Sequence, residues 1–192
     1  MAKFFGNLNA VVAVGFALMI ALLLWTGGAS NSIVWMTFLH VIAGVMWIGL
    51  LYYFNFVQIP TMPTVPAELK PGVSKYIAPK ALFWFRWAAL ATVLLGIGVA
   101  SLPNKGGELM AGLTFKEGFR VIGIGMWLGF IMAANVWFII WPNQKKALGI
   151  VDADADTKAK AASTAMMASR TNCLLSVPML YCMVAHGLGG GI

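Results

Sequence analysis

Five long apolar stretches restrict what this chain can fold into. Each holds roughly 18 to 26 residues with few charges, and about 20 apolar residues suffice to cross the hydrocarbon core of a bilayer. Only 10% of the 192 residues are charged, whereas a soluble domain has about a quarter. The sequence therefore predicts an all-α integral membrane protein, because an isolated segment inside lipid satisfies its backbone groups only as a helix.

The stretches predict a single transmembrane helical domain over residues 1–192, a bundle of about five helices. The expected spans are residues 8–25, 32–57, 82–102, 120–141 and 171–188. Residues 142–170 form the longest connection, which we expect as a cytoplasmic loop. Its DADAD run is like a calcium loop, but Thr157 and Ser163 stand where such a loop needs Gly and Glu. We therefore expect a solvated segment there.

Basic residues predict the orientation, because cytoplasmic connections carry the excess of Lys and Arg. One side holds nine: Lys3, Lys70, Lys75, Lys80, Lys145, Lys146, Lys158, Lys160 and Arg170. The other side holds Lys105, Lys116 and Arg120. An odd number of spans then places the N-terminus of this multi-pass protein inside and its C-terminus outside. Because these charges are dispersed among the connections, they do not indicate nucleic-acid binding.

The sequence holds two histidines, His40 and His186, and both fall within expected spans. An ionisable residue inside a membrane is costly and marks a candidate functional site. In the expected topology both lie in the outer half of the bundle. Imidazoles at similar depth on two helices suit the axial ligation of a b-type haem, so we expect His40 and His186 to bind a haem iron.

Nearby residues fit the same hypothesis. Gly44 lies one helical turn from His40, where a missing side chain would let a flat porphyrin approach the backbone. Three glycines of the fourth expected span offer a similar opening: Gly123, Gly125 and Gly129. Arg120, at the expected outer end of that span, is the candidate partner for the haem propionates. The sequence identifies no catalytic residue.

Other roles for the histidines remain open, including structural hydrogen bonds across helices, quinone binding and proton transfer. Copper is a further alternative, because Cys182 and His186 are four residues apart with Met179 and Met183 close by, and copper accepts such soft ligands. Met and Cys also fill ordinary spans. Three asparagines in the inner halves are expected to bond between helices: Asn55, Asn135 and Asn172.

Four blocks of the sequence resemble the urate oxidase N-terminal family, the membrane-embedded domain of bacterial membrane-bound urate hydroxylase. They are LHVIAGVMWIGLLYYFNF at 39–56, FWFRWAALATVLLG at 83–96, IMAANVWFIIWPNQKK at 131–146 and SRTNCLLSVPMLYCMVAHG at 169–187. The blocks occur in the family's order, and His40 and His186 fall on its histidines.

The resemblance implies an oxidase-like membrane protein that sends electrons from urate to cytochrome c. Longer members carry a c-type cytochrome domain, but this sequence has no CxxCH motif, so we expect a short form whose partner is a separate cytochrome c or a larger respiratory membrane complex. The expected function is electron transfer through haem b. The alternatives are a urate-oxidising oxidoreductase in its own right and a cofactor-free accessory subunit.

Overall fold

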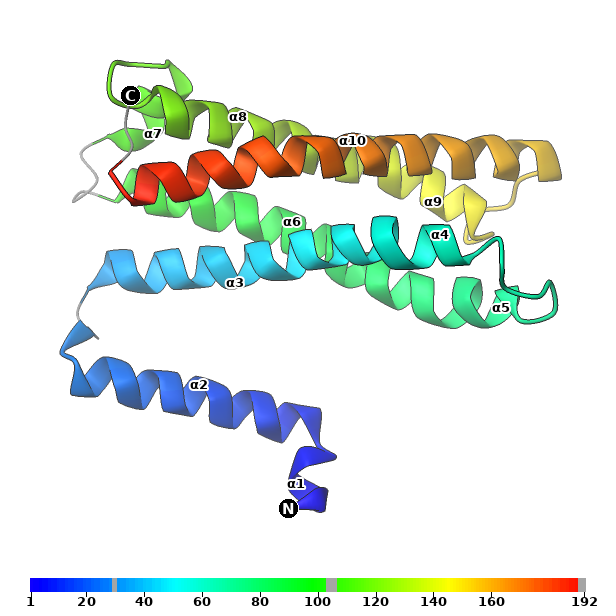
Figure 1. Ribbon diagram of the computed structural model, residues 1–192, viewed down its shortest axis with the longest axis horizontal. Coiled ribbons are helices and arrows are strands. Elements are labelled where there is room, and N and C mark those ends of the chain that lie inside the picture. The colour runs from blue at the N-terminus through cyan, green and yellow to red at the C-terminus, as the bar shows by residue number, and fades with distance from the viewer. Residues whose placement is uncertain (29–30, 103–106, 190–192) are drawn as a thin grey trace.

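The computed structural model describes residues 1–28, 31–102 and 107–189, and the described chain is helical without strands (Figure 1). This confirms the expected all-α fold. Lys105, one of the three basic residues expected on the outer side, lies outside the described residues.

Two helices come first, the short α1 (Ala2–Phe5) and the apolar α2 (Leu8–Trp25), and α2 has the expected bounds. Three long helical segments follow, and each contains a short π-helical stretch between two α-helical parts. The first joins α3 (Ser32–Tyr52), η2 (Tyr53–Gln58) and α4 (Ile59–Thr61). The second joins α5 (Lys70–Gly72), η3 (Val73–Ile77) and α6 (Ala78–Ser101). The third, after the short α7 (Glu108–Leu113), joins α8 (Arg120–Asn135), η5 (Val136–Ile140) and α9 (Trp141–Ala147).

The last helix, α10 (Ala155–Gly187), differs most from the sequence prediction. Residues 155–170, which were expected in the cytoplasmic loop 142–170, form its first half. They are rich in alanine, which has the highest helix propensity, and Ala161 and Ala165 are buried. The sequence prediction relied on hydrophobicity and therefore missed a helix that alternates polar residues with buried alanines.

The DADAD run begins α10 as a helix cap. The Asp154 carboxylate accepts hydrogen bonds from the Thr157 backbone N–H at 2.8 Å and from its hydroxyl at 2.9 Å. These bonds hold the pKa of Asp154 below its usual range, the backbone bond contributing most. A capping role therefore accounts for this carboxylate.

Four helices are long and apolar enough to cross a membrane: Leu8–Trp25, Ser32–Thr61, Lys70–Ser101 and Arg120–Ala147. The fifth expected span, 171–188, is the second half of α10, which is not among these four. Buried Asn172 and Ser176 lie among its apolar residues. Those side chains face other helices, so α10 is less apolar than a helix that contacts lipid all round.

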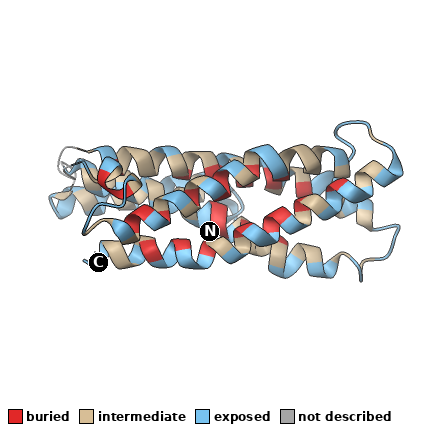
Figure 2. Ribbon diagram, turned by 90° about the horizontal axis from the view of Figure 1, so that it is seen from above, coloured by how far each residue is buried: buried red, intermediate tan, exposed pale blue. Residues whose placement is uncertain are grey.

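The bundle consists of two antiparallel hairpins, α3 with α6 and α8 with α10. Helix α2 lies to one side of them (Figure 1) and contacts α3 through the rings of Phe16 and Phe38, whose centroids are 6.3 Å apart. Buried residues lie along the inside of the bundle (Figure 2), and the largest of them include Trp47, Phe85, Leu51 and Met132. No residue of α2 is buried. The bundle therefore has its own core, and α2 contributes nothing to it.

Polar side chains join the helices away from the end where α3 begins. Asn135 Nδ2 donates to Asn172 Oδ1 at 2.7 Å, and Asn172 Nδ2 donates to the Met132 carbonyl at 2.9 Å. Asn55 Nδ2 donates to Ser169 Oγ at 2.8 Å. These bonds confirm the prediction that the three asparagines bond between helices.

Candidate functional site

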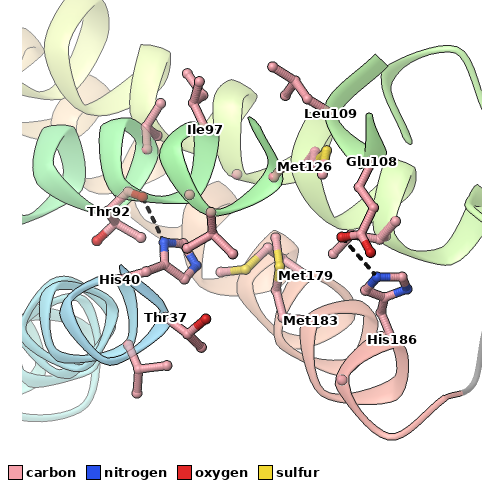
Figure 3. A pocket seen from close by; sticks show the side chains of 18 of the residues that line it. Thr37, His40, Thr92, Ile97, Glu108, Leu109, Met126, Met179, Met183 and His186 are labelled. Carbon is pink, nitrogen blue, oxygen red and sulfur yellow. Dashed lines mark hydrogen bonds and ion pairs between the residues drawn. The ribbon is translucent and has the colours of Figure 1, made fainter. Parts of the chain in front are cut away.

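A cavity of about 400 Å³ lies between the two hairpins, and both histidines line it (Figure 3). Its walls come from α3, α6, α7, α8 and α10, and most of the lining side chains are apolar. Its size falls within the range of small-molecule and cofactor sites. Two residues from distant parts of the sequence are thus brought to one site.

The register of α3 against α10 places His40 and His186 at the same level of the bundle. Tyr52, which lies 12 residues after His40, shares a hydrogen bond of 3.0 Å with Ser176, which lies 10 residues before His186. Asn55 and Ser169, bonded to each other, lie 15 residues after His40 and 17 residues before His186. Because the helices run antiparallel and an α-helix rises the same distance at each residue, the nearly equal steps from the Tyr52–Ser176 bond lead back to one level.

A hydrogen bond to a backbone carbonyl oxygen holds the His40 ring in place. Its Nδ1 lies 2.8 Å from the backbone carbonyl oxygen of Thr92 on α6 (Figure 3). A carbonyl oxygen only accepts, so Nδ1 carries the hydrogen and Nε2 of the neutral ring keeps its lone pair. Histidines that bind metals usually have their other ring nitrogen fixed in this way.

Gly96 makes the contact between His40 and Thr92 possible. In a helix, the carbonyl of residue 92 points toward residue 96. A Cβ atom at Gly96 would lie 2.9 Å from His40 Cε1 and 3.1 Å from Nδ1, closer than ordinary contact. The sequence analysis missed this residue, although a glycine within a span, in one of the four blocks, was a signal.

His186 has a different environment at the other side of the cavity. Its Nε2 lies 3.7 Å from a carboxylate oxygen of Glu108, the first residue of α7, and both side chains are less than one-fifth exposed. The ring of Phe119 lies 6.3 Å from the His186 ring, centroid to centroid. Sequence reasoning missed Glu108, which lies between two expected spans and therefore gave no sign of entering a cavity.

The four glycines that were expected to let a porphyrin approach the helix backbone have different surroundings. Gly44 faces α6, where an added Cβ would meet the Thr92 methyl group at an ordinary 3.8 Å, and it does not line the cavity. Gly123 and Gly125 lie against α7 and α10 and allow close helix packing. Gly129 lines the cavity, and a Cβ there would meet no atom within 4 Å. Of the four, only Gly129 opens the backbone toward the cavity.

Arg120 is exposed at the start of α8 and does not line the cavity. It follows Phe119, which contacts His186, so it lies at the same end of the bundle as the cavity. Arg120 therefore lies at the margin of the cavity, near the end of the bundle where it was expected.

The residues expected as copper ligands do not gather at one point. Met179 and Met183 line the cavity, and Figure 3 places them between the two imidazoles. Cys182 is buried against α8, where a Cβ added at Gly125 would lie 2.9 Å from its Cβ. Among the described residues, no group of three or more His, Cys, Asp or Glu side chains is placed to hold a metal ion.

The second half of the chain is similar to a known protein family. Residues 110–189 match the urate oxidase N-terminal family. The urate oxidase N-terminal match runs from α7 through α10 and includes His186, whereas His40 lies outside it. It confirms the resemblance noted for the last two sequence blocks. No curated protein and no solved structure matches the chain.

Proposed function

We propose that this chain is a membrane haem b protein related to the urate oxidase N-terminal family, and that it passes electrons toward a cytochrome c or a larger respiratory complex. The observation that carries the proposal is the pair of histidines on one cavity, at one level of two antiparallel helices. Two imidazoles that line one cavity at one level of a helical bundle would suit the ligation of a haem iron once Met179 and Met183, which lie between them, turn aside.

The residues present fit such a cofactor. The Thr92 carbonyl orients His40 for ligation through Nε2. Apolar walls would exclude water from the ring, and the open face of Gly129 would let the macrocycle approach α8. His186 would supply the second ligand once its Nε2 turns from Glu108 into the cavity, and Arg120 would bind a propionate at the margin. A haem held here supplies a one-electron redox couple.

The proposal includes the membrane arrangement expected from sequence, with α10 as the fifth span, the N-terminus inside and the C-terminus outside. Figure 1 supports it, because the α4–α5 and α9–α10 connections lie at one end of the bundle. The helical segments that flank these connections carry seven of the 13 basic residues: Lys70, Lys75, Lys80, Lys145, Lys146, Lys158 and Lys160. The cavity lies toward the opposite end. A cytochrome c partner would therefore approach from the outer side of a bacterial inner membrane.

The test is to purify the chain in detergent and record oxidised and reduced visible spectra with a pyridine haemochrome assay. We expect about one haem b per chain in the wild type and a loss of haem in His40→Gln. Glutamine keeps an N–H donor for the Thr92 carbonyl but is a poor iron ligand, so the fold should survive. Colourless wild-type protein, or full haem content in well-folded His40→Gln, would refute the proposal.

Urate oxidation is a second candidate function, favoured by the family match over residues 110–189. Urate added anaerobically to the oxidised, haem-loaded protein should then reduce the haem. If dithionite reduces the haem but urate does not, urate oxidation is excluded and the electron-transfer role stands. A folded but haem-free protein would instead favour an accessory subunit.

A further inference from the structure

Two cationic side chains from different helices meet at one indole ring. The guanidinium carbon of Arg86, on α6, lies 3.9 Å from the centroid of the Trp141 ring, and Lys145 Nζ, on α9, lies 5.7 Å from it. The Phe83 ring also lies near the Arg86 guanidinium carbon, with its centroid at 5.4 Å. Two positive charges are therefore held close together beside aromatic rings.

No carboxylate in the described part of the chain neutralises these two charges. The ion pair found there joins His186 and Glu108, whereas the charged ends of Arg86 and Lys145 form neither an ion pair nor a hydrogen bond among the described residues. At 3.9 Å the guanidinium packs against the indole ring, so its N–H donors remain available for an acceptor. Because both cations are only partly exposed and belong to membrane-crossing segments, an anion from outside the chain would be favoured here.

The surroundings favour a lipid phosphate over an anion dissolved in water. Tryptophan concentrates at the level of the headgroups in a bilayer, and Trp141 stands at the start of α9, whose last turn carries Lys145 and Lys146. Phe83 is 43% exposed and offers an acyl chain an apolar surface beside Arg86. A phosphodiester can accept two parallel hydrogen bonds from a guanidinium group. Two neighbouring cations favour a lipid with a net negative charge over a zwitterionic one.

We propose that Arg86 and Lys145 bind the phosphate of an anionic phospholipid such as phosphatidylglycerol. The Arg86 guanidinium would donate hydrogen bonds to the phosphate oxygens, and Lys145 would supply the second positive charge. Since Arg86 belongs to the first hairpin and Lys145 to the segment that continues α8, the lipid would join the two hairpins. The site does not depend on the haem, and only its place in the cytoplasmic leaflet rests on the proposed orientation.

The experiment titrates phosphatidylglycerol, and separately phosphatidylcholine, into the delipidated chain in detergent and counts bound lipids by native mass spectrometry. We expect the wild type to bind one phosphatidylglycerol about tenfold more tightly than phosphatidylcholine. Arg86→Met, which removes the charge and keeps a long apolar side chain, should abolish this preference, and Lys145→Gln should lower it about fivefold. Lys146→Gln is the matched control, because Lys146 is exposed on the same helix, and it should keep the preference.

A second variant of the same residue guards against misfolding. Arg86→Lys keeps the charge but loses the planar donor group, so it should weaken binding of phosphatidylglycerol about threefold. Thermal unfolding in lipid-free detergent shows whether Arg86→Met is folded. If it is not, Arg86→Lys and Lys145→Gln decide the question, and wild-type lipid preference in both would overturn the proposal.

The remaining outcomes are equally decisive. A wild type that binds both lipids equally, or a preference that is the same in Arg86→Met and Lys146→Gln, would overturn the site. Inorganic phosphate that displaces the phosphatidylglycerol would assign the position to a dissolved anion and overturn the lipid. A haem-free chain that keeps the preference would refute the proposed haem function and leave this inference standing.

Discussion

Replacing Gly96 by alanine should dislodge the His40 imidazole. The added Cβ would lie 2.9 Å from His40 Cε1, whereas ordinary contact begins near 3.4 Å. The ring must therefore retreat by about 0.5 Å, since the Cβ is fixed on the α6 backbone. This movement carries Nδ1 away from the Thr92 carbonyl, with which it now forms a bond of 2.8 Å.

The expected magnitudes decide which assay to use for Gly96→Ala. Losing the hydrogen bond costs about 0.5–1.5 kcal/mol, but alanine is favoured over glycine inside a helix by about 1 kcal/mol. The two effects nearly cancel, so the free energy of unfolding is a poor readout. Loss of an orienting partner for a metal-binding histidine lowers affinity by about 10- to 100-fold. Haem affinity is therefore the quantity to measure.

The assay titrates haem into haem-depleted protein in detergent and follows the Soret band. Gly49→Ala is the control, because Gly49 lies on α3 with no atom within 4 Å of an added Cβ. It should keep wild-type haem affinity and gain a little stability. If Gly96→Ala binds haem as tightly as Gly49→Ala does, the carbonyl of Thr92 does not position His40 and the reasoning is wrong.

Three further predictions concern the fold. Asn172→Ala should lower stability by about 1 kcal/mol, because it removes one of the two acceptors of Asn135 Nδ2 and its own bond to α8; unchanged thermal unfolding in detergent would contradict this. Gly125→Ala should cost about 1–3 kcal/mol, since its Cβ would lie 2.9 Å from that of Cys182, and denaturant unfolding would measure the loss. The cap at Asp154, whose pKa is lowered, stabilises α10 above the ordinary carboxyl pKa and is lost as pH falls through the lowered value. Asp154→Asn should therefore lose less helicity on acidification, as measured by circular dichroism, and equal loss in both proteins would rule out the cap as the cause.

The sequence predicted those features that depend on residues close together in the chain. Apolar stretches of sufficient length determined the helices, and the bounds of α2 agree with the expected ones. The same criterion failed for the first half of α10, where helix formation depends on alanine propensity and on small side chains buried against other helices. Hydrophobicity alone does not report that kind of stabilisation.

The composition of the candidate site depended on the tertiary structure. His40 and His186 were evident from sequence, because polar residues are rare within apolar spans. The roles of Gly96 and Glu108 were not, since each acts on a histidine from another helix. The position of Gly44 also depended on another helix. The helical spacing placed Gly44 on the same face of α3 as His40, but in the structure it faces α6 rather than the cavity.

Sequence by itself determined that this chain is helical and suited to a membrane, because the bilayer requires each segment to satisfy its own backbone. Only the tertiary structure determined that the two histidines share a cavity. That outcome depends on the register between α3 and α10, which the bonds of Tyr52 and Asn55 fix. Register arises from contacts between segments more than a hundred residues apart, and no local pattern encodes it.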